Sequence, residues 1–329
     1  MPVKNALFYR ANLIFPLKQG SVPSLFPSNT RFRMTSSIGV IGPGAMGLGM
    51  TQSLLRAGFR VLVRDVNLER NRLASAAGAI VCDSAAAMAR ETGSVITVVV
   101  DAAQTRDVCF GVGGICETMK PDGVVMVCST IAPADMVSIG AELNARQIQL
   151  LDAPISGGPA RAAAGTISMM IAGPQTALDQ CDAALKAMSD KRFIISHTAG
   201  DGARMKLVNN LMAGINLVAA AEAFSLGIKA GLDPKKIYDV VMASSGQSWM
   251  AGDRMKRIID GDRSVTAAVP ILTKDVGLAL DFAKSLKFPL PVGGQAHQIF
   301  LATLALGHVN EDDNAVIRYY QALTGIELP

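Results

Sequence analysis

Lys206 and Asn210 lie four residues apart in the segment GDGARMKLVNN, so in a helix their side chains share one face. That face continues with the apolar residues Ala213, Leu217, Ala220 and Phe224, and the neighbouring stripe (Val208, Leu211, Met212, Ile215, Val218 and Ala219) is apolar as well. A helix that is apolar all round is expected to be buried. Because a buried, unpaired ammonium group tends to lose its proton, the pattern predicts a proton-transfer lysine beside an amide that orients a substrate hydroxyl. The alternative is a surface lysine near the helix start, with its charge in water.

Three glycines, Gly42, Gly44 and Gly47, form the pattern G-x-G-x-x-G between a short apolar segment and a helical one. The first glycine permits a tight turn, the second lets the backbone approach a pyrophosphate, and the third allows close packing of helix and strand. The N-terminus of the helix then presents free N–H groups to the phosphates. We therefore expect a dinucleotide to bind at the loop formed by Gly42, Pro43, Gly44, Ala45, Met46 and Gly47.

An acidic residue, Asp65, closes the next predicted strand 23 residues after Gly42. A carboxylate there accepts hydrogen bonds from both ribose hydroxyls and repels a 2′-phosphate, so the sequence favours NAD over NADP. Arg64 and Arg70 lie close by in the sequence and keep NADP open. A domain that binds S-adenosylmethionine or FAD through a similar loop is a further alternative.

The chain has 329 residues, half of them hydrophobic, which is enough for two domains with their own cores. Apolar and helical segments alternate as far as about residue 198. This alternation predicts an α/β fold with a Rossmann-type doubly wound sheet over residues 37–198. The expected strands are Ile38–Ile41, Arg60–Val63, Val95–Val100, Val124–Cys128, Ile148–Leu151, Ile167–Ala172 and Phe193–Ile195.

The second half of the chain is expected to be helical, because no convincing strand follows His197. We predict an all-α domain over residues 199–329 that serves substrate binding and oligomerisation. A long helix, Gly202–Ala230, joins it to the first domain and places Lys206 near the cleft between them, where ligands commonly bind. Further helical segments are expected around residues 233–245, 249–260, 269–286 and 293–307.

Residues 1–36 differ from the rest of the chain: they hold five basic residues, no acidic one, and a run rich in proline and serine. Three interpretations compete: a transit peptide, a disordered extension, and residues upstream of a mis-assigned start. We favour the last, with Met34 as the true first residue, because the first predicted strand begins only four residues later.

Composition excludes several classes of partner. Without residues 1–36, the chain has 26 basic and 27 acidic residues and shows no basic stripe, so we expect no nucleic-acid binding. Five cysteines without a CxxC pair indicate reduced thiols in a cytoplasmic protein, and three widely separated histidines predict no catalytic metal. No apolar run approaches the roughly 18 residues that span a membrane. The apolar helices of the second half predict a homo-oligomer, a dimer or a tetramer.

Four motifs in order resemble the β-hydroxyacid dehydrogenase family, which includes 3-hydroxyisobutyrate dehydrogenase: GPGAMGLGM, LDAPISGGPARAAAGT, GDGARMKLVNN and TKDVGLAL. The resemblance covers about residues 37–329. It implies a nicotinamide-dependent hydroxyacid oxidoreductase in which Lys206 is the catalytic acid/base and Asn210 holds the substrate beside it. Without catalysis, the same chain would be a dinucleotide-binding sensor, although such a protein needs neither Lys206 nor Asn210.

The resemblance also implies roles for residues outside the long helix. Ser156, Gly157 and Gly158 would bind the substrate carboxylate through backbone N–H groups and the serine hydroxyl. Thr130 matches the family position that contacts the cofactor near the nicotinamide, and Lys274 matches a lysine that reaches into the cofactor and substrate site; its alternative is a surface helix lysine. The segment VVDA at residues 99–102 departs from the Leu-Pro or Val-Pro pair of many members.

Several segments of the second half, including ASSGQSWM and GHVNEDDNAVIRYY, resemble the branch of this family that oxidises C2 of the four-carbon sugar acid L-threonate to a 2-keto acid with NAD. Within the family, 3-hydroxyisobutyrate dehydrogenase and tartronate semialdehyde reductase are the alternatives. Ser248 and Trp249 are candidates for closing the substrate pocket, and a core tryptophan at a helix end is the alternative for Trp249.

Overall fold

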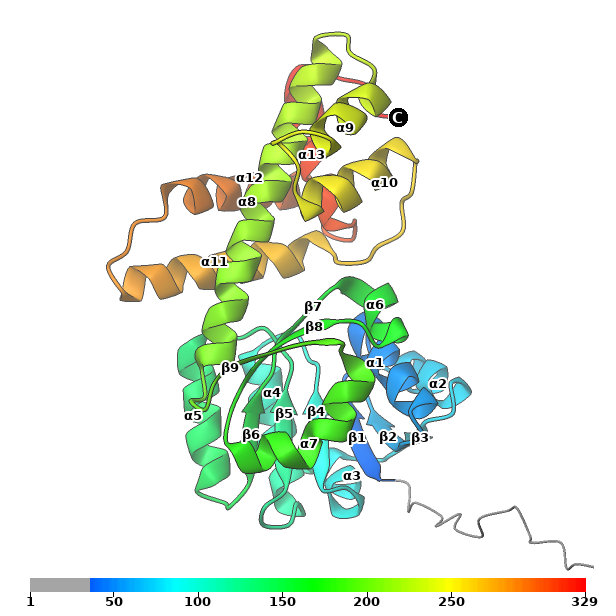
Figure 1. Cartoon of the computed structure of the whole chain (residues 1–329), viewed down its shortest axis with the longest axis vertical. Helices are drawn as coiled ribbons and strands as arrows, with labels where there is room; N and C mark the ends of the chain where they lie inside the picture. The colour runs from blue at the N-terminus through cyan, green and yellow to red at the C-terminus, as the bar shows by residue number, and fades with distance from the viewer. Residues whose placement is uncertain (1–35) are drawn as a thin grey trace, which may run out of the picture. The chain divides into compact units, whose positions relative to one another are not determined.

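The computed structural model describes residues 36–329 of the chain. A nine-stranded sheet occupies the N-terminal half of these residues (Figure 1). The strand order is β3-β2-β1-β4-β5-β6-β8-β7, with β9 paired to β8. The extension predicted over residues 1–36 lies outside the described residues, apart from Ser36. The described residues belong to one compact unit.

Six strands form the parallel part of the sheet: β1 (Ser37–Ile41), β2 (Arg60–Arg64), β3 (Ile80–Val81), β4 (Ser94–Thr97), β5 (Val124–Val127) and β6 (Gln149–Asp152). They are short, and apart from the exposed edge strand β3 their central residues are apolar and buried, as expected of strands that are covered on both faces. The chain runs outward from β1 to β2 and β3, then crosses back to β4. The carboxyl ends of β1 and β4 therefore form the point at which the strand order reverses, where ligands of such sheets bind.

The far edge of the sheet is mixed. Here β8 (Ser168–Ala172) pairs antiparallel with β6 and with β7 (Ile155–Ser156), and parallel with β9 (Lys191–Ser196). Both two-residue strands, β3 and β7, are absent from the sequence prediction, because two residues carry no periodicity.

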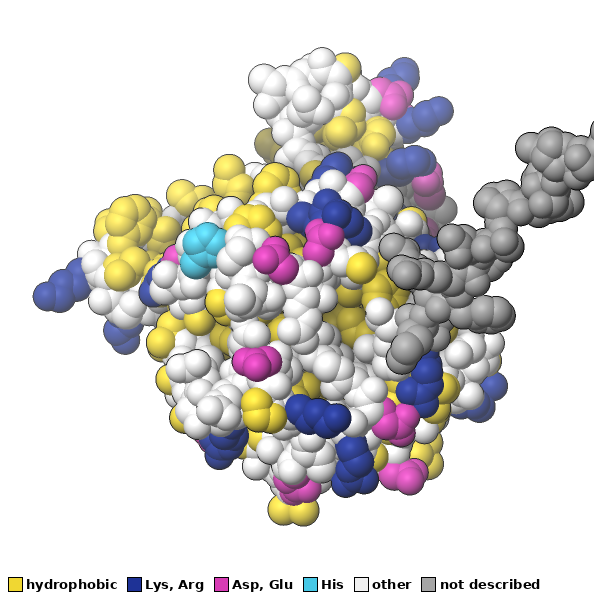
Figure 2. Space-filling model, turned by 60° about the horizontal axis from the view of Figure 1, so that its bottom comes forward, with side chains coloured by type: hydrophobic (Ala, Val, Ile, Leu, Met, Phe, Trp, Pro, Cys, Tyr) yellow, Lys and Arg dark blue, Asp and Glu magenta, His cyan; other side chains and the backbone are white. Residues whose placement is uncertain are grey.

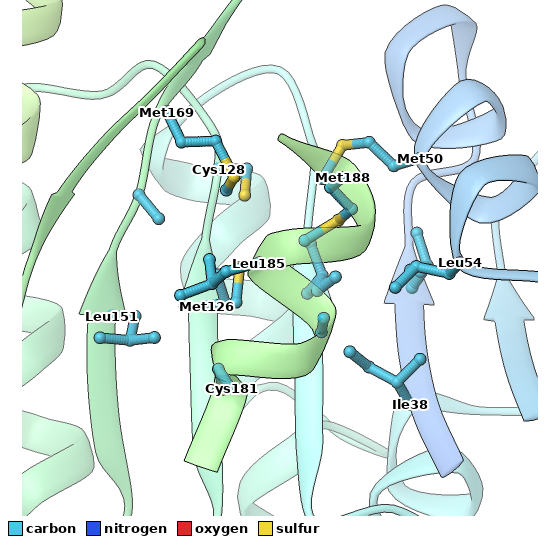
Figure 3. Close-up of a cluster of buried hydrophobic side chains, with 14 of the residues drawn as sticks. Ile38, Met50, Leu54, Met126, Cys128, Leu151, Met169, Cys181, Leu185 and Met188 are labelled. Carbon is cyan, nitrogen blue, oxygen red and sulfur yellow. The ribbon is translucent and has the colours of Figure 1, made fainter. Parts of the chain in front are cut away.

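Helices cover both faces of the sheet, which confirms the doubly wound prediction. One face packs against α1 (Ala45–Arg56), α2 (Leu68–Ala76), α6 (Gly158–Ala164) and α7 (Gln175–Met188). Figure 3 shows Met188 and Leu185 of α7 lying between Leu54 of α1 and Met126 of β5. The other face packs against α3 (Ala85–Glu91), α4 (Ala102–Phe110), the 3₁₀ turn η1 (Ile115–Glu117) and α5 (Pro133–Asn144).

The strand predicted over Val95–Val100 ends earlier, at Thr97. The reason is competition for backbone N–H groups. Val98 N still donates to Ile41 O in the neighbouring strand, but Val99 N donates to Ser129 Oγ (3.0 Å) and Val100 N to Gln104 Oε1 (3.0 Å). The chain therefore leaves the sheet and turns into α4.

The second half is helical, as predicted; beyond β9 the described residues contain no strand and one isolated β-bridge. Its elements are α8 (Asp201–Lys229), α9 (Pro234–Met242), the π-helical turn η2 (Ala251–Met255), α10 (Lys256–Ile259), α11 (Val269–Ser285), α12 (Pro291–Ala305), the 3₁₀ turn η3 (Asp313–Val316) and α13 (Ile317–Thr324). Proline stands in the first turn of α9, α11 and α12, where its missing N–H costs nothing.

Helix α8 links the two halves: its first turns contact β8 and β9, and farther along it packs against α11, α12 and α13 (Figure 1). The approach of α11 is close because Gly214 has no side chain; a Cβ there would lie 2.6 Å from Val276 Cγ2. Lys206 and Asn210 thus stand on a helix that is fixed by both halves of the chain.

The prediction that α8 is buried on all sides is wrong. The face of Lys206, Asn210 and Leu217 is buried, but Val208 is 60% exposed and Met212 is 59% exposed. Elements of both halves, among them β8, α11, α12 and α13, pack against α8 but leave the side chains of Val208 and Met212 uncovered. An apolar composition alone does not require partners from the same chain.

Helix α8 is also long and apolar enough to cross a membrane by length and composition, with a mean hydropathy of 1.6 over its most apolar window. The expectation that no apolar segment is long enough to span a membrane is therefore wrong for α8 by this measure. In the structure, 44% of this window is buried against other elements of the same chain.

Candidate active site

The glycine loop connects β1 to α1 at the point where the strand order reverses. Gly42 has a φ of 88°, and its N–H donates to Arg64 O of β2 (3.0 Å). Gly44 is the N-cap of α1, and no side chain at this position caps the helix. No N-cap side chain therefore occupies the first N–H groups of α1, as a phosphate site requires.

The space around the glycines fits a dinucleotide. A Cβ on Gly47 would lie 2.2 Å from Gly42 O, so only glycine lets α1 begin this close to the turn. A Cβ on Gly44, in contrast, would meet no atom within 4 Å. The open space beside Gly44 is where a pyrophosphate approaches the backbone in this motif.

Asp65 directly follows β2, and its backbone is clamped by a buried asparagine. Asp65 N donates to Asn71 Oδ1 and Asn71 Nδ2 donates to Asp65 O, both at 2.8 Å. One carboxylate oxygen of Asp65 accepts from Asn67 N (2.8 Å). The Arg64 guanidinium donates to the carbonyl oxygen of Asp65 rather than to its carboxylate. Asn71 could not be predicted from the sequence, because a buried asparagine in the first turns of a helix has no distinctive pattern.

Lys206 is 6% exposed, and its Nζ donates to Ile155 O of β7 at 2.7 Å. Burial lowers the pKa of Lys206 to about 8; Asp275 acts in the opposite direction, and the neighbouring charge of Lys274 lowers the pKa further. A pKa this close to the working pH lets a lysine both accept and donate a proton, as proton transfer requires. The prediction that Lys206 is buried is confirmed, and the surface alternative is excluded.

Asp275 connects the other predicted side chains. Asn210 Nδ2 donates to Asp275 Oδ2 (2.6 Å), and Lys274 Nζ donates to Asp275 Oδ1 (2.7 Å) and to Thr130 O (2.8 Å). Asp275 is only 2% exposed. Elements far apart in the sequence thus converge here: α8 supplies Asn210, α11 supplies the acid and the lysine, and the loop after β5 supplies the threonine.

The carboxylate of Asp275 balances the charge of Lys274 and fixes the amide of Asn210. The oxygen of that amide accepts from Asn209 Nδ2 (3.0 Å), so the orientation of Asn210 is defined on both sides. Lys274 was predicted as a site residue and Asp275 was not, although Asp275 is its neighbour in the TKDVGLAL motif.

Ser156, Gly157 and Gly158 follow directly after Ile155, the residue that accepts from Lys206. Gly157 has a φ of 131° and Gly158 a φ of 78°, conformations that side chains disfavour. The structure therefore places this turn directly after the residue that Lys206 contacts. The glycine loop and Asp65 lie at β1 and β2, and the hydrogen-bond network around Asp275 does not include them.

Trp249 is 52% exposed, so it is not a core tryptophan. The Arg254 guanidinium lies 5.7 Å from the centroid of the Trp249 ring. Ser248 Oγ accepts from Ala251 N (3.0 Å). In the segment VVDA, which differs from the Leu-Pro or Val-Pro pair of many family members, Asp101 caps α4 by accepting from Gln104 N (2.8 Å). The VVDA segment thus serves as the start of a helix.

No group of three His, Cys, Asp or Glu side chains within residues 36–329 is placed to hold a metal ion. Charged side chains of both signs are interspersed on the face shown in Figure 2, without a stripe of one sign. Two surface cavities of about 290 and 350 Å³ lie elsewhere, around Arg318 and around Asp182, and contain none of the predicted site residues.

Two family profiles match the chain. The NAD-binding domain of 6-phosphogluconate dehydrogenase matches residues 37–197, and the NAD-binding domain of NADP-dependent 3-hydroxyisobutyrate dehydrogenase matches residues 200–320. The doubly wound sheet, the glycine loop and these matches define the class: an NAD(P)-binding oxidoreductase.

Individual relatives narrow the class. The chain is 42% identical to an L-threonate dehydrogenase of Cupriavidus necator; the match covers 90% of this chain and 99% of the relative. It is 38% identical to an L-threonate dehydrogenase of Escherichia coli, where the match covers 87% of this chain and 95% of the relative. A crystal structure described as 3-hydroxyisobutyrate dehydrogenase from Salmonella typhimurium is 39% identical, with a TM-score of 0.81 over 86% of this chain and 99% of that one. The chain therefore belongs to the 3-hydroxyisobutyrate dehydrogenase-like family of β-hydroxyacid dehydrogenases, and its activity is that of a hydroxyacid dehydrogenase.

Proposed function

We propose that the chain oxidises the C2 hydroxyl of L-threonate, or of a close four-carbon sugar acid, to the 2-keto acid with NAD. The observation that carries the mechanism is the buried Lys206 with its lowered pKa, one helical turn from an amide fixed by Asp275. The choice of substrate is supported by the similarity of the chain to the L-threonate dehydrogenases of Cupriavidus necator and Escherichia coli. The Salmonella structure makes 3-hydroxyisobutyrate the second candidate.

In this proposal neutral Lys206 accepts the proton of the substrate hydroxyl as the hydride leaves C2. A bound nicotinamide dinucleotide supplies the hydride acceptor. Asn210 holds the reacting oxygen beside Lys206, and Ser156, Gly157 and Gly158 bind the carboxylate. General acid–base help of this kind contributes roughly 10²–10⁴-fold, and orientation supplies much of the remainder.

The cofactor would lie along the glycine loop, with its ribose on Asp65 and its reactive end near Thr130 and Lys274. The open space at Gly44 and the uncapped start of α1 support the first part. The hydrogen bond between Lys274 and Thr130 O supports the second, because it brings the two residues to one place.

The substrate is tested by the initial rate of NADH formation with L-threonate, beside a panel of three- to five-carbon hydroxyacids. We expect L-threonate to give the highest kcat/KM. A higher value with 3-hydroxyisobutyrate would replace the substrate and keep the family. If the protein binds NADH but shows no activity with any acid of the panel, the proposed substrate class is contradicted.

The lysine mechanism predicts a pH dependence. Lys206 accepts a proton only when neutral, so kcat/KM for oxidation should rise as the pH rises through about 8 and level off above it. Reduction of the keto acid needs the protonated form, so its rate should fall over the same range. Initial rates in both directions between pH 6 and pH 10 check this prediction; two flat profiles would contradict it.

The NAD preference predicts the effect of Asp65→Ser. Loss of the carboxylate removes the ribose acceptor and the repulsion of a 2′-phosphate, so the ratio of kcat/KM for NAD over NADP should fall by about 10-fold or more. Glu69→Gln is the matched control, since Glu69 is a nearby exposed acid that pairs with Arg72 (2.7 Å). An unchanged ratio in the Asp65 variant would remove Asp65 from the cofactor site.

We further propose a cytoplasmic homo-oligomer, with residues 37–198 as the cofactor domain and residues 199–329 as the substrate and oligomerisation domain. The exposed apolar side chains Met205, Val208 and Met212 on α8 support an interface between copies. Light scattering tests the oligomeric state.

A further inference from the structure

A second buried acid, Asp152, lies at the start of the helix that carries Lys206. It is the last residue of β6 and is fully buried. Its Oδ2 accepts from Gly200 N (2.8 Å) and from Ala203 N (3.0 Å), both at the N-terminus of α8. The N-cap residue of α8 is Gly200, which has no side chain to cap the helix. Asp152 therefore supplies, from 48 residues earlier in the chain, the acceptor that a capping side chain normally provides.

The strand segment that begins at Asp152 contacts α8 again at Lys206. Three residues after Asp152, Ile155 O accepts from Lys206 Nζ (2.7 Å), and Lys206 lies three residues after Ala203. The segment 152–155 and the start of α8 are thus joined by hydrogen bonds at two points, which lie three residues apart on each of them. Between them the contact is tight, because a Cβ on Gly202 would lie 2.7 Å from Asp152 O and 2.7 Å from Met170 O.

Full burial acts against the charged form of Asp152. The second oxygen of Asp152, Oδ1, has no hydrogen-bond partner among the described residues. Burial raises the pKa of Asp152 to about 6, against the lowering effect of the backbone N–H groups, and the nearby charge of Asp201 raises it further. A buried carboxylate with one unpaired oxygen is a poor choice for stability alone.

We propose that Asp152 is a positioning residue for the reaction: by accepting from Gly200 and Ala203 it fixes α8 along its axis and so holds Lys206 at the substrate. The inference rests on the proposed role of Lys206. A slip of α8 by one residue moves a side chain by about 1.5 Å along the axis and turns it by about 100°. A misplacement of about 1 Å costs up to roughly 100-fold in rate.

The test compares Asp152→Ala with Asp152→Asn. The alanine variant loses both acceptor contacts, and its kcat should fall by about 10- to 100-fold while the Kd for NADH stays close to the wild-type value. The asparagine variant keeps an oxygen for both N–H groups, so it should restore most of kcat. If the alanine variant does not fold, Asp152→Ser takes its place, since its hydroxyl is too short to reach both groups.

Asp233→Ala is the matched control, because Asp233 caps the exposed start of α9 by accepting from Lys236 N (2.9 Å). It should lower Tm and leave kcat unchanged. The proposal is overturned if the alanine and serine variants lower Tm and keep kcat, or if the asparagine variant loses as much kcat as the alanine variant.

A double variant separates this inference from the proposed function. If Asp152 acts through Lys206, Asp152→Ala should add no further loss of rate in a Lys206→Met background. A further loss of the same size as in the wild-type background would overturn the inference. Full activity of Lys206→Met alone would instead overturn the proposed function.

Discussion

Replacing Lys206 with methionine should lower kcat by roughly 10²–10⁴-fold, because the proton of the substrate hydroxyl then has no acceptor. Methionine keeps most of the volume of the lysine side chain, so the packing around a residue that is 6% exposed is preserved. The Kd for NADH, measured by fluorescence titration, should stay close to the wild-type value, since the glycine loop lies at another part of the sheet. The variant should also lose the pH-dependent rise of the oxidation rate.

Lys256→Met is the control for loss of a positive charge in the same half of the chain. Lys256 is exposed and pairs with Asp260 (2.6 Å), and its removal should leave kcat unchanged. Retained turnover in the Lys206 variant would contradict the acid/base role and leave the lysine a structural partner of Ile155 O. Loss of NADH binding together with kcat would indicate a role in building the cofactor site.

The second large effect is expected from two substitutions in the glycine loop that differ in kind. Gly44→Ala should lower Tm only slightly: its Cβ meets nothing within 4 Å and its φ of −71° suits alanine, which is a poorer N-cap than glycine. The same Cβ stands where the pyrophosphate approaches, so the Kd for NADH should rise by about 10-fold or more. Gly47→Ala should weaken NADH binding and also lower Tm, because its Cβ would lie 2.2 Å from Gly42 O.

Gly294→Ala provides the control. Gly294 lies in α12, a Cβ there meets nothing within 4 Å, and alanine in a helix stabilises by about 0.5–1 kcal/mol relative to glycine. Differential scanning fluorimetry and NADH titration report Tm and Kd for all three variants. Unchanged NADH affinity in Gly44→Ala would contradict the placement of the pyrophosphate, whatever happens at Gly47.

The cofactor half of the fold could be predicted from the sequence because its signals are local. An apolar strand, a glycine turn and a helix follow one another within about twenty residues around Gly42, and Asp65 stands at the end of the next strand. Lys206 and Asn210 could be predicted as a pair for the same reason, since a spacing of four residues places them on one helix face.

Contacts between distant segments could not be predicted in this way. The bond between Asn210 and Asp275 joins residues 65 positions apart, and the bonds from Gly200 and Ala203 to Asp152 span about 50. No periodicity marks an acid whose partner lies on another element. The exposed stripe of α8 escaped prediction for a related reason: Val208 and Met212 are apolar, and only the arrangement of the surrounding helices shows that one face stays uncovered.

The central claim is hydride transfer from C2 of L-threonate, and L-threonate labelled with deuterium at C2 tests it most directly. The enzyme is incubated with the labelled acid and NAD, and the NADH formed is analysed by mass spectrometry. The proposed function predicts that each NADH carries one deuterium and that the acid becomes the 2-keto acid. Unlabelled NADH, formed while the acid is consumed, would show that oxidation occurs at another carbon and would contradict the account.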